Sequence, residues 1–190
     1  MGRPRSAEAE AAIVSATLDL LAESGFAGLS VEAVAGRAGV GKATIYRRWP
    51  GKAELVADAV SALGAVADET VGGDVRTDLV TLLEGVRRKF QSSLQGRLFA
   101  RLLGEARADC EFWAAYRERV VRPGRARLAA VVRRGIGSGE LRADLDVDLA
   151  VDQLIGPLVY RLVARADSAE TTTADVERLV DGAMDGLAAH

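Results

Sequence analysis

The sequence predicts an all-α fold of about nine helices, and two observations support this prediction. Apolar residues recur every three or four positions along most of the chain, the spacing that places side chains on one face of a helix. Capping residues, glycines and prolines separate these stretches. With 190 residues, 49% of them hydrophobic and 27% charged, the chain is long enough for one domain or two small ones with a buried core.

The rarity of two residue types excludes several kinds of site. The chain has one cysteine, Cys110, and one histidine, His190, so neither a disulfide framework nor a Cys/His zinc site can form within one chain. The scattered carboxylates lack the spacing of an acid–base or nucleophilic constellation, so we expect no enzyme activity and no cofactor. We find no signal peptide and no apolar run of roughly 18 to 20 residues, so we expect a cytoplasmic protein.

The first predicted helix covers residues 6–24. Ser6 is a suitable N-cap, and Glu8 and Glu10 place negative charge in the first turn, where it complements the helix dipole. The apolar positions that follow share one face until Gly25, where we expect the helix to stop.

Two short helices follow, and their spacing is that of a helix-turn-helix. Ser30 caps the second helix, which ends after barely two turns at Gly39. The third covers about 42–48 and ends before the next proline, which disfavours helix in the residue ahead of it. Ala35 is small where two helices would cross, and Ile45 returns an aliphatic side chain to the shared core.

The third helix carries a local concentration of positive charge. From Arg37 to Lys52 there are five basic residues and no acidic one, although the net charge of the chain is −2. Ile45 and Trp49 fall on one side, which we assign to the core. The opposite face and its flanks are small, hydroxylated, aromatic and basic, as suits a DNA major groove: Lys42, Ala43, Thr44, Tyr46, Arg47 and Arg48.

Residues 6 to 56 resemble the N-terminal DNA-binding domain of the tetracycline-repressor (TetR) family of bacterial transcription regulators. The resemblance is carried by the loop Gly28-Leu29-Ser30, the turn Gly39-Val40, the Thr44-Ile45-Tyr46 triplet and the aromatic-Pro-x-Lys segment from Trp49 to Lys52. It implies a DNA-binding domain over residues 1–52 and an effector-binding and dimerisation domain over residues 53–190. It also implies a homodimer with one helix-turn-helix in each subunit.

The same resemblance implies roles for individual residues. Lys42, Thr44, Tyr46 and Lys52 would anchor phosphates, while Ala43, Arg47 and Arg48 would face bases. Members of the family commonly have tyrosine and then histidine or another aromatic residue where this chain has Arg47-Arg48. Each of these two arginines therefore either reads bases or holds the DNA backbone. Arg3 and Arg5 precede the first helix on an arm that either enters a minor groove or is disordered.

The second half predicts further helices. A fourth ends near Gly72-Gly73, and Asp74 caps a fifth. Residues 111–136 read as one helix or two, and we favour one helix with a kink at Pro123-Gly124. We expect a loop over residues 135–139.

The last two predicted helices carry the expected dimer interface. Asp144 or Asp146 opens the first, whose wide apolar arc predicts burial on two sides, and Thr173 caps the second. From the pattern alone, both helices could equally complete the core of a monomer. In the TetR family they pair as a four-helix interface, which here would comprise Ile155, Leu158, Val159, Leu162, Val176, Leu179, Val180, Ala183 and Leu187.

Most of the large aromatic side chains lie in the second half. Aromatic and aliphatic residues line small-molecule cavities, and they also form cores. We expect a ligand cavity lined by Phe90, Phe99, Leu103, Phe112, Trp113, Tyr116 and Tyr160. Arg161 could face such a cavity and select an acidic effector, or it could be solvated.

The resulting hypothesis is a ligand-responsive transcriptional regulator. As the resemblance implies, it would bind a palindromic double-stranded DNA operator as a homodimer and be released when a small molecule binds the C-terminal domain. The alternative is a helical ligand-binding or protein-interaction module that regulates through a protein partner and binds DNA only non-specifically.

Overall fold

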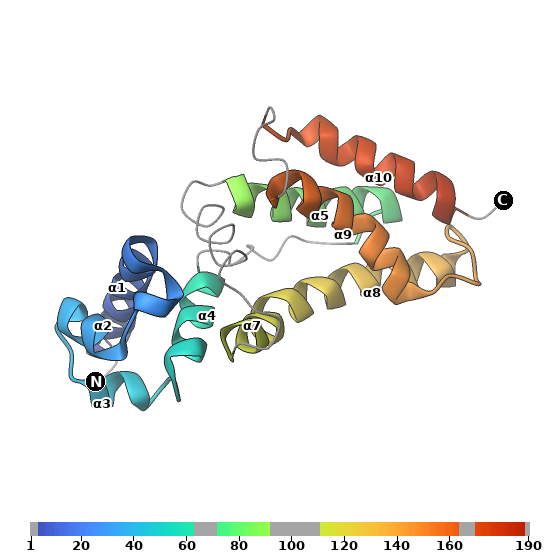
Figure 1. Ribbon diagram of the computed structural model, residues 1–190. Helices are drawn as coiled ribbons and strands as arrows, with labels where there is room; N and C mark the ends of the chain where they lie inside the picture. The colour runs from blue at the N-terminus through green and yellow to red at the C-terminus, as the bar shows by residue number, and fades with distance from the viewer. Residues whose placement is uncertain (1–3, 63–71, 92–110, 164–169, 189–190) are drawn as a thin grey trace. The chain divides into compact units, whose positions relative to one another are not determined.

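The computed structural model describes residues 4–62, 72–91, 111–163 and 170–188 (Figure 1). The described residues form two compact units. The head unit contains residues 4–62 and 111–122, and the C-terminal unit contains residues 72–91, 123–163 and 170–188. All regular elements among these residues are helices, which confirms the predicted all-α class. Three residues to which the sequence analysis gave a role lie outside the described residues: Arg3, Phe99 and Leu103.

The head unit begins with α1 (Pro4–Gly28), and this helix is interrupted where the sequence predicted its end. Gly25 has φ 71° and ψ −178°, which are not helical values, and one further turn follows. The stretch Ala7–Gly28 has the length and composition of a membrane span, which corrects our expectation that no such stretch exists. Ile13 and Leu21 are buried, as in the core helix of a globular unit, so the observation is weak support for a membrane span.

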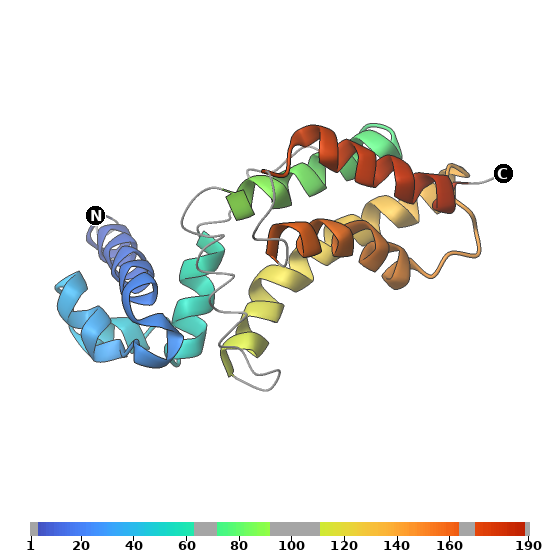
Figure 2. The ribbon, with the colours of Figure 1, turned by 45° about the horizontal axis from the view of Figure 1, so that its top comes forward.

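Three further helices of the head are α2 (Val31–Ala38), α3 (Lys42–Tyr46) and α4 (Lys52–Ala62) (Figures 1 and 2). Both α2 and α4 contact α1, and α3 contacts α2. Val34 from α2, Ile45 from α3 and Leu55 from α4 are almost completely buried. The domain boundary that we expected between residues 52 and 53 falls inside α4. The remainder of α4 contributes buried side chains to the same unit.

The region expected to kink at Pro123-Gly124 is helical without interruption from residue 111 to residue 138. It contains α7 (Glu111–Tyr116), the π-helical segment η1 (Arg117–Val121) and α8 (Arg122–Ser138). The backbone N–H of Arg122 donates to the carbonyl of Arg117, five residues earlier. Pro123 has no N–H to donate, and the irregularity lies in the turn just before it.

The C-terminal unit is built from α5 (Val75–Gln91), α8, α9 (Val147–Val163) and α10 (Thr173–Leu187). Its core contains Leu79 and Leu83 from α5, Val132 from α8, Leu158 from α9 and Val180 from α10. In Figures 1 and 2, α10 runs beside α5, with which it is in contact.

Two helix N-caps of this unit are residues that the sequence analysis predicted, and one is a different residue. Asp74 caps α5, with its Oδ1 atom 2.9 Å from the N–H of Thr77. Asp146 opens α9 by accepting from the N–H of Leu149 at 3.0 Å. The N-cap of α10 is Thr172 and not Thr173, because Thr172 exchanges hydrogen bonds with Asp175 in a capping box.

The prediction of a loop over residues 135–139 is wrong for most of that range. Helix α8 continues to Ser138, and the left-handed turn is at Gly139, where φ is 80°. Gly135 is a packing residue, because a Cβ atom there would lie 2.8 Å from Leu141 and 2.9 Å from Val75. The glycine therefore allows Leu141 and Val75 to approach the backbone of α8 closely. The sequence alone does not distinguish a glycine with this packing role from a glycine in a turn.

Candidate nucleic-acid interface

A tight turn joins α2 to α3 and fixes their relative orientation. The Ser30 side chain accepts from the N–H of Ala33 at 3.1 Å and begins α2. Gly39 ends it with φ 66° and ψ 31°, and the next N–H, that of Val40, donates to the carbonyl of Ala35 at 3.0 Å. Glycine adopts this left-handed conformation without the strain that a Cβ atom would add. The predicted helix-turn-helix is therefore present.

Two apolar side chains anchor α3 and the residues after it to the head core. Ile45 is 1% exposed and Trp49 is 2% exposed, which confirms both assignments to the core. The indole N–H of Trp49 also donates to Asp58 on α4 at 2.9 Å. Because α3 has only five residues, these contacts, more than its own hydrogen bonds, hold it in place.

The opposite face of α3 is open to solvent. Tyr46 is 50% exposed, and Thr44 is half-buried. The other four predicted DNA-contacting residues of this segment are exposed: Lys42, Ala43, Arg47 and Arg48. The structure therefore places these six residues around one short helix whose inner side is buried.

Acidic residues from α1 and α2 pair with most of the basic residues around α3, which the sequence did not predict. Lys42 donates to Glu32 at 2.9 Å, and Arg37 donates to Glu23 at 2.6 Å. Arg48 forms an ion pair with Glu10, and its guanidinium lies 5.4 Å from the centroid of Trp49. Among the described residues, Arg47 is the member of this basic group whose side chain shows no hydrogen bond or ion pair.

The pairing changes the titration of these groups. A hydrogen bond from Lys42 lowers the pKa of the Glu32 carboxyl, and the same bond raises the pKa of Lys42. Likewise, the hydrogen bond between Arg37 and Glu23 lowers the pKa of Glu23. Both carboxylates are therefore ionised at neutral pH and partly neutralise the basic surface.

Lys52 differs from the other basic residues because it is half-buried within the head. Its Nζ atom donates to the carbonyl oxygen of Phe26 at 2.9 Å and lies 4.4 Å from the centroid of the Phe26 ring. This contact holds the start of α4 against the end of α1. A phosphate contact would have to use the remaining ammonium hydrogens.

The described aromatic residues that we predicted to line a ligand cavity belong to two different units. Phe112 and Tyr116 are buried in the head unit, where the Phe112 ring centroid lies 5.0 Å from that of Phe26. The Trp113 ring stacks on that of Tyr116, with 5.4 Å between the ring centroids. In the C-terminal unit, Phe90 is half-buried and Tyr160 is 60% exposed.

The residues predicted to form the dimer interface divide into a buried set and a partly buried set. Four of the predicted contacts, Leu158, Val176, Val180 and Leu187, lie in the core of their own unit. The other five are only partly buried: Ile155, Val159, Leu162, Leu179 and Ala183. Leu149 on α9 is 57% exposed, so this helix is buried on one side by its own chain and not on both.

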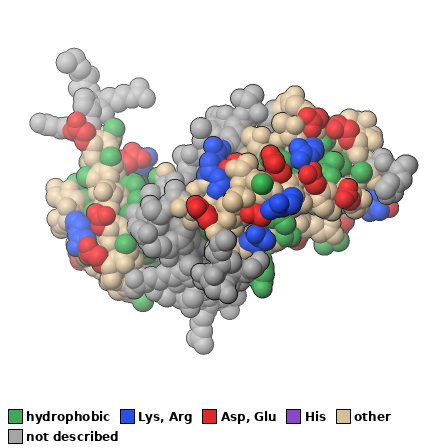
Figure 3. Space-filling view, turned by 90° about the horizontal axis from the view of Figure 1, so that it is seen from above, with side chains coloured by type: hydrophobic (Ala, Val, Ile, Leu, Met, Phe, Trp, Pro, Cys, Tyr) green, Lys and Arg blue, Asp and Glu red, His purple; other side chains and the backbone are tan. Residues whose placement is uncertain are grey.

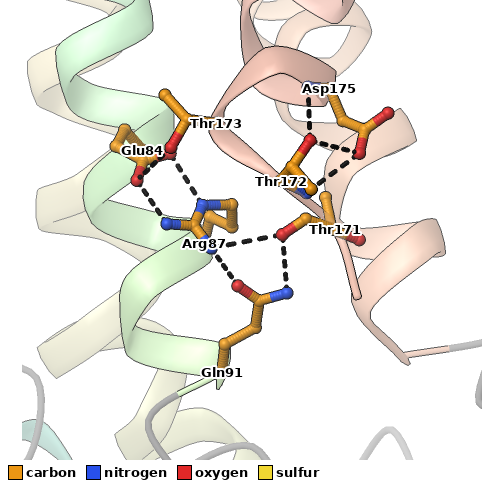
Figure 4. A network of polar contacts seen from close by, with 7 residues as sticks. All are labelled: Glu84, Arg87, Gln91, Thr171, Thr172, Thr173 and Asp175. Carbon is orange, nitrogen blue, oxygen red and sulfur yellow. Dashed lines mark hydrogen bonds and ion pairs between the residues drawn. The ribbon is translucent and has the colours of Figure 1, made fainter. Parts of the chain in front are cut away.

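A polar network that the sequence did not predict joins α5 to the start of α10 (Figure 4). Arg87 donates to Glu84 at 2.7 Å and to the carbonyl of Thr171 at 3.2 Å. Gln91 donates to the same carbonyl at 2.7 Å. Arg161 pairs with Asp175 at 3.3 Å, so it takes part in the capping of α10.

Elsewhere on the C-terminal unit, basic and acidic side chains are intermingled, as Figure 3 shows for one face.

The fold and the exposed basic face of α3 define a helix-turn-helix regulator. Residues 13–59 match the family model described as bacterial regulatory proteins, tetR family. Residues 71–183 match the tetracyclin repressor-like C-terminal domain. The chain therefore belongs to the TetR family of bacterial transcription regulators.

Two relatives extend over nearly the whole chain. The uncharacterized HTH-type transcriptional regulator YdeS of Bacillus subtilis is 36% identical over 99% of this chain and 94% of its own length. The DNA-binding transcriptional repressor TetR of Mycobacteroides abscessus is 32% identical over 92% of this chain and 90% of its own length.

Solved structures show the same fold. The TetR family transcription regulator SCO0332 is 34% identical, covers 96% of this chain and 100% of its own, and has a TM-score of 0.69. The regulator FadR from Bacillus subtilis, solved in complex with stearoyl-CoA, has a TM-score of 0.70 at 18% identity, with 93% of this chain and 98% of its own covered. The latter likeness concerns the fold alone.

Proposed function

We propose that this regulator is a repressor that binds a palindromic operator as a homodimer and is released by a small-molecule effector. The observation that carries the proposal is the exposed face of α3. Just after this helix, the Arg47 side chain has no partner among the described residues, and Ile45 on the opposite side of the helix is buried. A relative of similar length carries the name of a DNA-binding repressor. The cytoplasm, where bacterial DNA lies, is the compartment that this function requires.

Roles for the residues around α3 follow from their chemistry and exposure. Arg47 has the fork geometry that matches guanine O6 and N7, and Ala43 is small enough to allow close approach to base edges. Tyr46 and Thr44 carry hydroxyl groups that bind phosphate oxygens. The positive side chains of Lys42, Arg48 and Lys52 complete the phosphate-binding surface.

The partly exposed apolar residues of α9 and α10 support a dimer. Side chains such as Ile155, Val159 and Leu179 are apolar and incompletely covered by their own chain, so a second copy would bury them. An isologous pairing would relate the two heads by a two-fold axis, and a palindromic operator has the same symmetry. Half-sites would then lie one turn of DNA apart, about 34 to 36 Å.

The effector would act by favouring one head spacing over another. A difference of about 1 to 3 kcal/mol between the two states changes operator affinity by about 5- to 150-fold. The complex of FadR with stearoyl-CoA is an example of ligand binding on this fold. The half-buried Phe90 of the C-terminal unit is a candidate for contact with an effector, whereas Phe112 and Tyr116 are buried in the core of the head.

The experiment that tests the proposal measures Arg47→Ala on duplexes selected from a random library by the wild-type protein. We expect the variant to lose about 1 to 3 kcal/mol of binding free energy on the selected duplex and to tolerate base changes at one position. Arg133→Ala is the control, because it removes an exposed arginine of the C-terminal unit.

Two other outcomes would change the assignment. An equal loss on selected and unrelated duplexes would make Arg47 a phosphate contact. If the wild-type protein selects no sequence and its binding disappears as salt rises, then regulation through a protein partner becomes the better account.

A further inference from the structure

The basic residues around α3 are held by carboxylates of neighbouring helices in the protein without DNA. Glu32 lies in the first turn of α2 and accepts from Lys42 at 2.9 Å. Glu10 lies on α1 and pairs with Arg48. Both basic residues belong to the surface proposed to contact phosphates, so each carboxylate bonds a side chain to which the proposed function assigns a phosphate.

The Lys42–Glu32 pair is open to exchange because it is exposed, whereas Glu10 of the second pair is partly buried. The side chains of Lys42 and Glu32 are 55% and 60% exposed, so a phosphate oxygen can reach the ammonium group without unfolding or repacking. Exposed ion pairs are weak and are screened by salt. The structure therefore offers no barrier to replacing a carboxylate partner with a phosphate.

We propose that Glu32 and Glu10 act as internal competitors of DNA, holding Lys42 and Arg48 until phosphates replace them, and so set the affinity and salt dependence of operator binding. The inference rests on the proposed function, because it requires α3 to face DNA. The two glutamates are positioning residues: they contact the phosphate-binding side chains and not the DNA.

The salt dependence follows from counterion release. A lysine that neutralises a phosphate releases a condensed cation from DNA, which adds about 0.9 to the slope of log affinity against log salt. When Lys42 leaves Glu32, the freed carboxylate stands beside the DNA and attracts a cation in return. The wild-type slope is therefore smaller than the number of phosphate contacts would give.

The test compares Glu32→Gln with Glu23→Gln on the full-length protein. Both variants remove one negative charge from the head and break an exposed ion pair, but Arg37, the partner of Glu23, lies on α2 outside the proposed contact set. We expect Glu32→Gln to bind both a selected and an unrelated duplex about 1.4- to 5-fold more tightly at 0.1 M salt, which corresponds to the range of an exposed pair, about 0.2 to 1 kcal/mol. Its salt slope should rise by up to about 0.9, and Glu23→Gln should show neither change.

A double mutant identifies the route of the effect. In a Lys42→Gln background, Glu32→Gln should give no further tightening, because the carboxylate then has no lysine to withhold. Tightening that persists there, or equal tightening by Glu23→Gln, would overturn the inference in favour of general repulsion between the head and DNA. Unchanged affinity in Glu32→Gln would overturn it as well.

Failure of the proposed function would look different. If α3 does not face DNA, Arg47→Ala and Glu32→Gln both leave binding unchanged. If α3 faces DNA but the glutamates do not compete, Arg47→Ala weakens binding while Glu32→Gln has no effect. A Glu10→Gln variant, measured in the same way, repeats the test for Arg48.

Discussion

The Lys42–Glu32 ion pair of the head and the Arg134–Asp78 ion pair of the C-terminal unit differ in how far they are buried. In the head, Glu32 and Lys42 meet at the surface with both side chains more than half exposed. In the C-terminal unit, the Asp78 side chain is 3% exposed and accepts from Arg134 at 2.6 Å and from the N–H groups of Gly72 and Gly73, each at 3.2 Å.

The difference shows which charges are free to change partner. A buried carboxylate with several donors cannot lose one of them without leaving an unsatisfied charge, so it fixes the structure. An exposed pair costs little to open, so it can be replaced by a ligand. The charges that fix α5 against α8 are therefore of the first kind, and those around α3 are of the second.

Replacing Asp78 should have the largest effect. We expect Asp78→Asn to lower the free energy of unfolding by about 2 to 3 kcal/mol, because it removes the charge that satisfies Arg134 and weakens two further hydrogen bonds. Urea denaturation followed by circular dichroism measures this loss. The control is Asp181→Asn, which breaks an exposed pair with Arg76 and should change the midpoint little. Equal losses in both variants would remove the distinction between buried and exposed pairs.

A pair of glycines on α8 tests the packing of the C-terminal unit. Gly135→Ala should cost about 1 to 3 kcal/mol, because the added methyl group would overlap Leu141 and Val75. In the same helix, a Cβ atom at Gly137 meets nothing within 4 Å. Gly137→Ala should therefore be neutral or stabilising by up to about 1 kcal/mol. Thermal unfolding of the two variants separates them, and a stable Gly135→Ala protein would contradict the close contact.

Acid should weaken the C-terminal unit through its bonded carboxylates. Burial acts to raise the pKa of Asp78, but hydrogen bonds from Arg134, Gly72 and Gly73 outweigh it and lower the pKa below 3.8. Hydrogen bonds, first from the backbone N–H of Thr172 and then from Arg178, also lower the pKa of Asp175. A lowered pKa adds stability that is complete above the unfolded value and lost as pH falls through the folded one.

The wild-type protein should therefore keep this contribution at pH 5 to 7 and lose it below about pH 4. The Asp78→Asn variant lacks one of the titrating groups, so its stability should fall less steeply over the same range. Urea midpoints at a series of pH values measure this, and parallel curves for the two proteins would contradict the role of Asp78.

The local features of the head could be predicted from the sequence. The Ser30 cap, the turn at Gly39 and the burial of Ile45 and Trp49 each depend on residues within one or two helical turns, so periodicity and capping rules identify them. The family resemblance then supplied the fold of the second half in outline.

Contacts between distant segments could not be predicted in this way. Periodicity marks Phe112 as apolar but does not show that it packs in the head against Phe26. The segment from Arg37 to Lys52 is basic by its own residues, but the glutamates that pair with it lie earlier in the chain, on α1 and α2. The packing role of Gly135 likewise depends on Leu141 and on Val75, which is sixty residues away in the chain.

The most direct test of the account is a competition measurement of DNA binding. Fragments from upstream of the gene are mixed with the protein, with unrelated DNA as competitor and salt varied, and the number of subunits per site is determined. The account predicts a complex that survives competition with two subunits on each site. Binding that the competitor abolishes, with affinity collapsing as salt rises, would contradict it and leave only a basic surface on the head.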